Sequence, residues 1–166
     1  MVAIVTGSFD PITIGHLEII KKAAQEYETL YVVALVNPEK EGMFNLNQRK
    51  ELIELSVRDI PNVVADAYLG LTAEYMNQRG ITKIVRGIRS EKDEKYEIEL
   101  ANAMKEFNPN FDTSFIYCDE QFSEITSTVV RDRIKKGQDL SGFVPEQIIE
   151  SLMKMLEKTK NNIKRR

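Results

Sequence analysis

The chain's single histidine lies in the segment GSFDPITIGH, which covers residues 7–16. Thr13 is a suitable N-cap for a helix that begins after it, and this would place His16 in the first helical turn. Gly7 is expected to let the backbone turn sharply ahead of that helix. Because a helix N-terminus offers unpaired N–H donors and a partial positive charge, an imidazole there can donate to a phosphoryl oxygen as negative charge grows on it. The segment therefore predicts an anion site, and the simpler alternative is a capped surface helix whose histidine faces solvent.

Three cationic side chains elsewhere in the chain could bind the same kind of anion. Lys40 is a mobile point charge in an expected loop, although its neighbours Glu39 and Glu41 are equally typical of a solvated surface. Arg86 and Arg89 flank a glycine in the sequence RGIR, directly after an expected buried strand. Two guanidiniums at this spacing can grip two anionic groups in a planar, bidentate way. The cations therefore point to a ligand, or a pair of ligands, with several negative charges.

A run of hydroxyl side chains, Thr126, Ser127 and Thr128, opens another expected helix. One hydroxyl is enough to cap a helix, so the others are available to phosphate oxygens beside the helix N–H groups. Neither the dinucleotide fingerprint G-x-G-x-x-G nor the nucleotide-hydrolase loop G-x-x-x-x-G-K accompanies these segments. Redox use of a nicotinamide is therefore disfavoured.

The elements that must position these residues follow from the hydrophobic pattern. Apolar runs rich in β-branched residues predict five short buried strands, at residues 2–6, 30–36, 63–67, 83–85 and 113–117. Apolar residues at three- and four-residue steps predict helices at residues 15–27, 46–58, 71–79 and 91–107, followed by two closing helices at 127–136 and 145–158. This alternation predicts a parallel α/β sheet covered on both faces. Ligands of such sheets bind beyond the carboxyl ends of the strands, where the polar segments above are expected.

Composition bounds the class of protein. The chain has 166 residues, 23 Lys and Arg, 26 Asp and Glu, and a net charge of −3, so one domain spanning residues 1–166 is expected. A single cysteine, Cys118, excludes an internal disulfide, and one histidine leaves too few ligands for structural zinc. No apolar run approaches the roughly 20 residues of a membrane span, no signal peptide is recognisable, and the acidic total argues against nucleic-acid binding. We expect a cytoplasmic protein without membrane or nucleic-acid partners, whose basic residues 158–166 form a frayed helix end.

Together the polar segments resemble the bacterial phosphopantetheine adenylyltransferases, a family of the T-x-G-H nucleotidyltransferase superfamily that acts in coenzyme A biosynthesis. The matching pieces are GSFDPITIGH, NPEKEGMF at residues 37–44, RGIR at 86–89 with Tyr96 and Glu97, and ITST at 125–128. T-x-G-H alone is a weak signal, whereas the whole set in this order and spacing is specific. The resemblance implies a Rossmann-like, doubly wound sheet of five parallel strands with helices on both faces and a C-terminal helical segment.

The resemblance also implies an activity and a set of site residues. AMP would be transferred from ATP to 4′-phosphopantetheine, giving 3′-dephospho-coenzyme A and pyrophosphate by in-line attack without a covalent enzyme intermediate. His16 would stabilise the transition state, with Lys40, Arg89 and Ser127 as further catalytic residues. Phosphopantetheine would contact Ser8, Lys40, Thr72 and Arg86. ATP would contact Ser8, Phe9, His16, Gly87, Ile88, Arg89, Glu97, Phe122, Ser123, Glu124, Ile125, Thr126, Ser127 and Thr128.

Further implications of the resemblance are magnesium carried by the ATP phosphates rather than by protein side chains, a homohexamer, and feedback inhibition by coenzyme A. Ser8 stands where many members have Thr, and Thr126 and Thr128 where many have Ser, so each hydroxyl is kept. Two alternatives are another superfamily member, such as a nicotinamide-mononucleotide adenylyltransferase or a glycerol-phosphate cytidylyltransferase, and a nucleotide-binding module without turnover. The loop that carries Lys40 and the sequence RGIR with Glu97 argue against another superfamily member. The full set of anion-contacting side chains argues against a module without turnover.

Overall fold

The computed structural model describes residues 1–36 and 38–166, so Asn37 of the segment NPEKEGMF lies outside the described residues. Five strands form one parallel sheet in the order β3-β2-β1-β4-β5. The chain builds β1, β2 and β3 outward in one direction and then returns to place β4 on the other side of β1. The expected parallel, Rossmann-like sheet is confirmed, with its strand order reversing between β1 and β4. The strands are β1 (Val2–Gly7), β2 (Thr29–Leu35), β3 (Val63–Tyr68), β4 (Lys83–Ile88) and β5 (Asp112–Tyr117).

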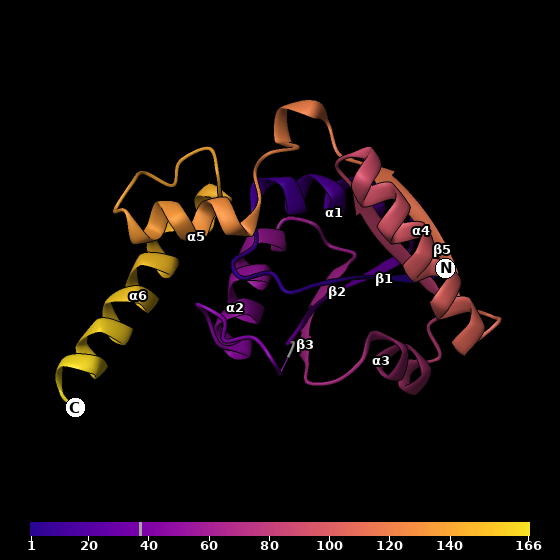
Figure 1. Cartoon of the computed structure of the whole chain (residues 1–166), viewed down its shortest axis with the longest axis horizontal. Helices are drawn as coiled ribbons and strands as arrows, with labels where there is room; N and C mark the ends of the chain where they lie inside the picture. The colour runs from indigo at the N-terminus through magenta and orange to yellow at the C-terminus, as the bar shows by residue number, and fades with distance from the viewer. Residues whose placement is uncertain (37) are drawn as a thin grey trace.

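Helices cover both faces of this sheet (Figure 1). Their bounds are α1 (Ile14–Glu26), α2 (Leu46–Val57), α3 (Thr72–Arg79), α4 (Glu91–Phe107), α5 (Ser127–Lys135) and α6 (Ile149–Lys164), with short 3-10 turns at η1 (Glu120–Phe122) and η2 (Glu146–Ile148). None of the helices in residues 1–36 and 38–166 combines the length and the apolar character that crossing a bilayer requires.

Alternate residues of the central strand β1 face two separate hydrophobic clusters, as a strand buried on both sides requires. Ala3 and Val5 pack with the apolar faces of α1 and α2, whereas Ile4 packs with α3. The first cluster also takes in Val130 of α5 and Leu152 of α6. The C-terminal helices therefore complete the layer that α1 and α2 begin, and they lie together at the end of the molecule away from α4 (Figure 1).

The element bounds differ from the sequence expectation at two places that matter. Strand β4 does not end at Val85 but runs to Ile88, because Arg86 and Gly87 continue the parallel register with Phe115 and Ile116 of β5. Arg86, the first arginine of RGIR, therefore projects from a strand and not from the loop after it. Helix α6 continues to Lys164, so the basic end is mostly helical and its frayed part is short.

The turn after β1 is also built differently from the expectation. Gly7 does not adopt the left-handed backbone region, whereas Phe9 does, with φ of 45°. A Cβ on Gly7 would lie 3.4 Å from the Phe9 ring, which is an ordinary van der Waals contact. The sharp turn is thus at Phe9 and not at Gly7.

Candidate active site

The N-terminus of α1 is closed by a reciprocal pair of hydrogen bonds between Thr13 and His16. The His16 backbone N–H donates to Thr13 Oγ1 at 3.3 Å, and the Thr13 backbone N–H donates to His16 Nδ1 at 3.0 Å. This is a capping box in which histidine takes the place usually held by Glu or Gln. The expected cap at Thr13 is confirmed, and its partner is the candidate catalytic side chain itself.

This cap determines which ring nitrogen of His16 carries the proton. A backbone N–H is a fixed donor, so Nδ1 must accept and a neutral ring is protonated at Nε2. Arg89 Nη2 lies 3.4 Å from Nε2 and is itself a donor. Two donors therefore face a common point, and an anionic oxygen placed between them would accept from both.

The surroundings of His16 favour its neutral form. Removal of the ring from solvent, and then the positive charge of Arg89, lower the pKa of His16 to about 3. The Phe9 ring packs edge-on against the imidazole, with centroids 5.0 Å apart, and forms part of its low-dielectric wall. His16 is therefore a hydrogen-bond donor at neutral pH and not a cation.

A first cavity of about 280 Å³ lies above the carboxyl ends of β1 and β4. Gly7 and Phe9 line one side of it, Arg86 and Gly87 line another, and Glu97 of α4 closes it. A Cβ on Gly87 would come within 3.1 Å of the Ile19 side chain, so a larger residue here would press on Ile19. The mixed polar and aromatic wall suits a planar ligand that also carries charge.

Arg86 and Glu97 form an ion pair in the wall of this cavity. Arg86 donates through Nε at 2.6 Å and Nη2 at 3.0 Å to the two Glu97 carboxylate oxygens, and through Nη1 at 3.1 Å to Thr6 Oγ1. The family resemblance assigns Arg86 and Glu97 to different ligands, whereas the structure joins them in a bidentate contact. Arg86 also lines the neighbouring third cavity, so one guanidinium stands between two spaces.

A second cavity, of about 420 Å³, gathers positive charge beside the first. It is lined by cationic and hydroxyl side chains together with Asp10, Glu41 and Gly42: His16, Lys40, Arg49, Arg89, Arg131, Ser8, Thr126, Ser127 and Thr128. His16 and Arg89 line both the first and the second cavity, so the two open onto the same pair of donors. This arrangement fits a ligand whose phosphates pass from one cavity into the other.

The third cavity is larger, about 840 Å³, and mainly apolar. Leu35, Leu69, Leu71 and Leu100 supply its apolar side, and Ser8 lies at its junction with the second cavity. The polar residues Thr6, Thr72 and Arg86 also line it. Such a space suits a ligand with a long, weakly polar arm and an anionic end.

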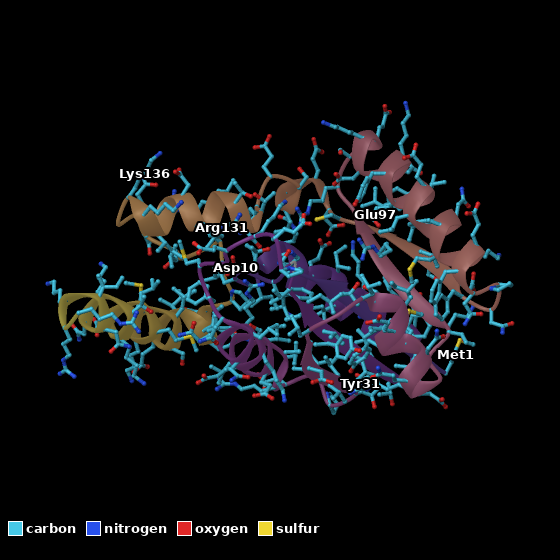
Figure 2. The ribbon with its side chains drawn as sticks, turned by 60° about the horizontal axis from the view of Figure 1, so that its bottom comes forward. Met1, Asp10, Tyr31, Glu97, Arg131 and Lys136 are labelled. Atoms are coloured by element: carbon cyan, nitrogen blue, oxygen red, sulfur yellow. The ribbon has the colours of Figure 1, made fainter. Side chains whose placement is uncertain are left out.

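Three residues that the sequence reading missed hold the second cavity together: Asp10, Arg49 and Arg131. The buried Asp10 carboxylate accepts the backbone N–H groups of Met43 and Phe44 at 3.0 and 2.9 Å. Arg131 Nη1 donates to the Asp10 carbonyl oxygen at 2.9 Å, and Figure 2 shows these two residues close together with Glu97 across the site on α4. Sequence gave no local sign of these contacts, because they join segments 33 to 121 residues apart.

The sequence is similar to known proteins of one enzyme family. A family model described as cytidylyltransferase-like matches residues 4–133. The phosphopantetheine adenylyltransferase of Clostridium tetani is 39% identical over 153 residues, covering 92% of this chain and 96% of that protein. The enzymes of the same name from Clostridium kluyveri and Staphylococcus carnosus are 39% and 38% identical, covering 96% and 90% of this chain and 98% and 93% of their own lengths. The chain belongs to the phosphopantetheine adenylyltransferase family.

A solved structure supports the fold of this family. A Vibrio parahaemolyticus protein assigned as a nicotinate-nucleotide adenylyltransferase superposes with a TM-score of 0.66 at 18% identity, covering 92% of this chain and 97% of its own. At that identity the likeness concerns the fold alone.

Most residues that the family resemblance assigns to ligands line the three cavities. They are Ser8, Phe9, His16, Lys40, Thr72, Arg86, Gly87, Arg89, Glu97, Thr126, Ser127 and Thr128. Ile88 differs, because the whole residue is only 2% exposed and packs inside the protein. Phe122, Ser123, Glu124 and Ile125 lie in η1 and the loop before α5, beside the start of α1. Their roles in ATP binding stay predictions.

The three hydroxyls at the start of α5 already have protein partners. Thr126 caps the helix by accepting from the Val129 N–H, and Thr128 accepts from Arg131. Ser127 donates its proton to the Pro11 carbonyl oxygen at 2.8 Å, which fastens α5 to the turn after β1. Ser127 could therefore donate to a phosphate only after giving up this bond.

The carboxylates that the structure describes around the cavities are not arranged as a metal site. Within residues 1–36 and 38–166, no three His, Cys, Asp or Glu side chains gather in the way that metal ligands do. Asp10, one of the two carboxylates that line the second cavity, already accepts hydrogen bonds from two backbone N–H groups. Magnesium carried by the ATP phosphates stays a prediction.

The half-buried, capped environment of His16 predicts an unusual titration. Because it is the chain's only histidine, its ring signals in a two-dimensional NMR spectrum are unambiguous. In the unliganded protein we expect the Nε2–H tautomer, with no protonation between pH 8 and pH 5. Since an unfolded histidine binds its proton near pH 6.5, folding stability should fall as pH drops through 6.5 toward 3. A midpoint near 6.5 in the folded protein would contradict the assignment.

Proposed function

We propose that this chain transfers AMP from ATP to 4′-phosphopantetheine, forming 3′-dephospho-coenzyme A and pyrophosphate. The names of its relatives support the reaction, and the meeting of His16 Nε2 and Arg89 Nη2 at 3.4 Å carries the structural argument. Apart from this contact with each other, neither atom is hydrogen-bonded to another residue in the part of the chain that the structure describes. Both lie where the first and second cavities join, which is the place an α-phosphate would occupy between adenosine and pyrophosphate.

The third cavity is the proposed site of the phosphopantetheine arm. Its leucine-rich wall can bury the weakly polar arm, while Ser8 lies at the junction with the second cavity, where Lys40 also lies. These two side chains can hold the acceptor phosphate next to the α-phosphorus. The adenosine moiety of ATP would then occupy the first cavity, between Phe9 and Glu97.

The reaction is a direct displacement. An oxygen of the acceptor phosphate forms a bond to the α-phosphorus while the bond from that phosphorus to the bridging α,β oxygen breaks, and its electrons leave with pyrophosphate. The nucleophile is already an anion, so the protein need not remove a proton from it. Catalysis then consists of positioning the two phosphates and stabilising charge on the oxygens around phosphorus.

The charge stabilisation falls to the donors described above. His16 and Arg89 donate to the α-phosphate oxygens, and Arg131 in the second cavity offsets part of the charge of departing pyrophosphate. Magnesium bound to the ATP phosphates would add a Lewis acid there. His16 acts as a neutral donor preset by its cap, which avoids reorganisation of the ring during the reaction.

Family membership also supports wider proposals for this chain. We propose a cytoplasmic homohexamer that uses magnesium with ATP and is inhibited by coenzyme A, which shares most of its chemistry with the product. These proposals rest on the resemblance.

The reaction is tested by pyrophosphate release. We expect release from MgATP that depends on added 4′-phosphopantetheine, with matching formation of dephospho-coenzyme A by mass spectrometry. CTP, nicotinamide mononucleotide and glycerol phosphate, tested in place of the proposed substrates, should give little product. A folded protein that prefers one of these, or that releases no pyrophosphate with phosphopantetheine, would sink the proposal.

The role of His16 is tested by two substitutions. His16→Ala removes both the donor and the cap, whereas His16→Gln removes the ring but keeps an acceptor able to close a capping box. Both variants should lose about 10²- to 10³-fold in kcat, the usual cost of one such donor, with little change in the KM for ATP. A normal kcat with raised KM values in His16→Gln would show that the ring only binds ground-state substrate.

A further inference from the structure

The strongest feature left unused by the proposed reaction is the buried ion pair of Asp10 and Arg49. Asp10 belongs to the turn after β1, and Arg49 to the first turns of α2. Their side chains are only 8% and 6% exposed, and Arg49 Nε lies 3.4 Å from Asp10 Oδ1. Burying two charges is costly unless hydrogen bonds satisfy their other polar atoms. The hydrogen-bond partners of Asp10 and Arg49 therefore show which segments of the chain the pair holds together.

Each side chain of the pair holds backbone of the segment at residues 38–44, which we call the Lys40 loop. Asp10 accepts from the N–H groups of Met43 and Phe44, and Arg49 Nε donates to the Phe44 carbonyl at 2.8 Å. Arg49 Nη1 reaches back to the Ser8 carbonyl at 3.2 Å. The pair therefore ties the end of the Lys40 loop to the turn that carries Ser8.

Packing at Gly42 makes this tie sensitive to small displacements. A Cβ on Gly42 would lie 1.7 Å from Arg49 Nη2, so the loop backbone rests directly on the guanidinium. Lys40 lies two residues earlier, on the exposed part of the loop, and its side chain lines the second cavity. Because a lysine stem is long and flexible, the position of its backbone limits where its charge can be presented.

We propose that Arg49, paired with Asp10, is a positioning residue that sets Lys40 against Ser8 for the acceptor phosphate. This inference rests on the proposed function, because it concerns how the acceptor is held. Arg49 acts through the loop and not by touching substrate. Preorganisation of this kind can matter greatly, since a misplacement of about 1 Å in a positioning element can cost on the order of 10²-fold in rate.

The test is a double-mutant cycle between Arg49 and Lys40, measured as kcat/KM for phosphopantetheine at saturating MgATP. Arg49→Lys keeps the positive charge but lacks the forked guanidinium that donates to the Phe44 and Ser8 carbonyl oxygens at once. This change should lower kcat/KM by about 10- to 100-fold. In a Lys40→Ala background the same change should cost less than about threefold, because the residue through which it acts is gone. Additive losses, or an Arg49→Lys enzyme with wild-type kinetics, would overturn the proposal.

A second variant and a control separate positioning from loss of folding. Gly42→Ala displaces the Arg49 guanidinium without changing any charge, and should lower kcat/KM in the same direction. Arg58→Lys makes the same substitution at the end of α2, on a side chain that is 60% exposed, and should leave the kinetics unchanged. A Gly42→Ala enzyme with wild-type kinetics and an intact fold would contradict the role of this contact.

Amide hydrogen exchange provides a readout that needs no substrate. The N–H groups of Met43 and Phe44 should exchange faster in Arg49→Lys than in the wild-type protein, while those of β1 keep their protection. If the wild-type chain released no pyrophosphate with phosphopantetheine, the proposed function would fail. The exchange rates of these two amides would still show whether Arg49 holds the Lys40 loop in place. Unchanged exchange at both amides would show that Arg49 does not hold the loop.

Discussion

The site depends on one topological constraint, the reversal of strand order between β1 and β4. Crossovers that leave a parallel sheet in opposite directions cannot cover the carboxyl ends of the two strands at which they diverge. The turn after β1 and the end of β4 therefore face a shared open space. Phe9 and His16 enter it from one side, and Arg86 and Arg89 enter it from the other, although some 70 residues separate them in sequence.

The cationic side chains in this space are held in place by ion pairs and hydrogen bonds within the protein. The chain is acidic overall, yet cationic side chains surround the second cavity. Arg86 is held by Glu97, and Arg49 and Arg131 contact Asp10, so these guanidiniums are fixed by the protein before any phosphate arrives. Arg89 is the guanidinium that faces the histidine donor. Fixed dipoles and charges of this kind stabilise a reacting phosphate without the cost of reorienting solvent.

The parts predicted from sequence are those that local pattern determines. Strand and helix alternation predicted the fold, and the residue types around His16 predicted the cap at Thr13. What was missed depends on long-range contact. Asp10 reads as an ordinary turn residue and Arg49 as a surface position of a helix, and only the folded chain shows that both are buried on the Lys40 loop. The pairing of Arg86 with Glu97 likewise needed β4 to extend beyond its apolar run.

The central claim is that the acceptor phosphate attacks the α-phosphorus directly, with the protein supplying position and donors but no covalent bond. The stereochemistry at that phosphorus tests this claim most directly. A single diastereomer of ATP with sulfur on the α-phosphorus should give a dephospho-coenzyme A analogue with inverted configuration, because one in-line displacement inverts the centre. Retention of configuration would require two successive displacements through an enzyme-bound nucleotidyl group and would contradict the account.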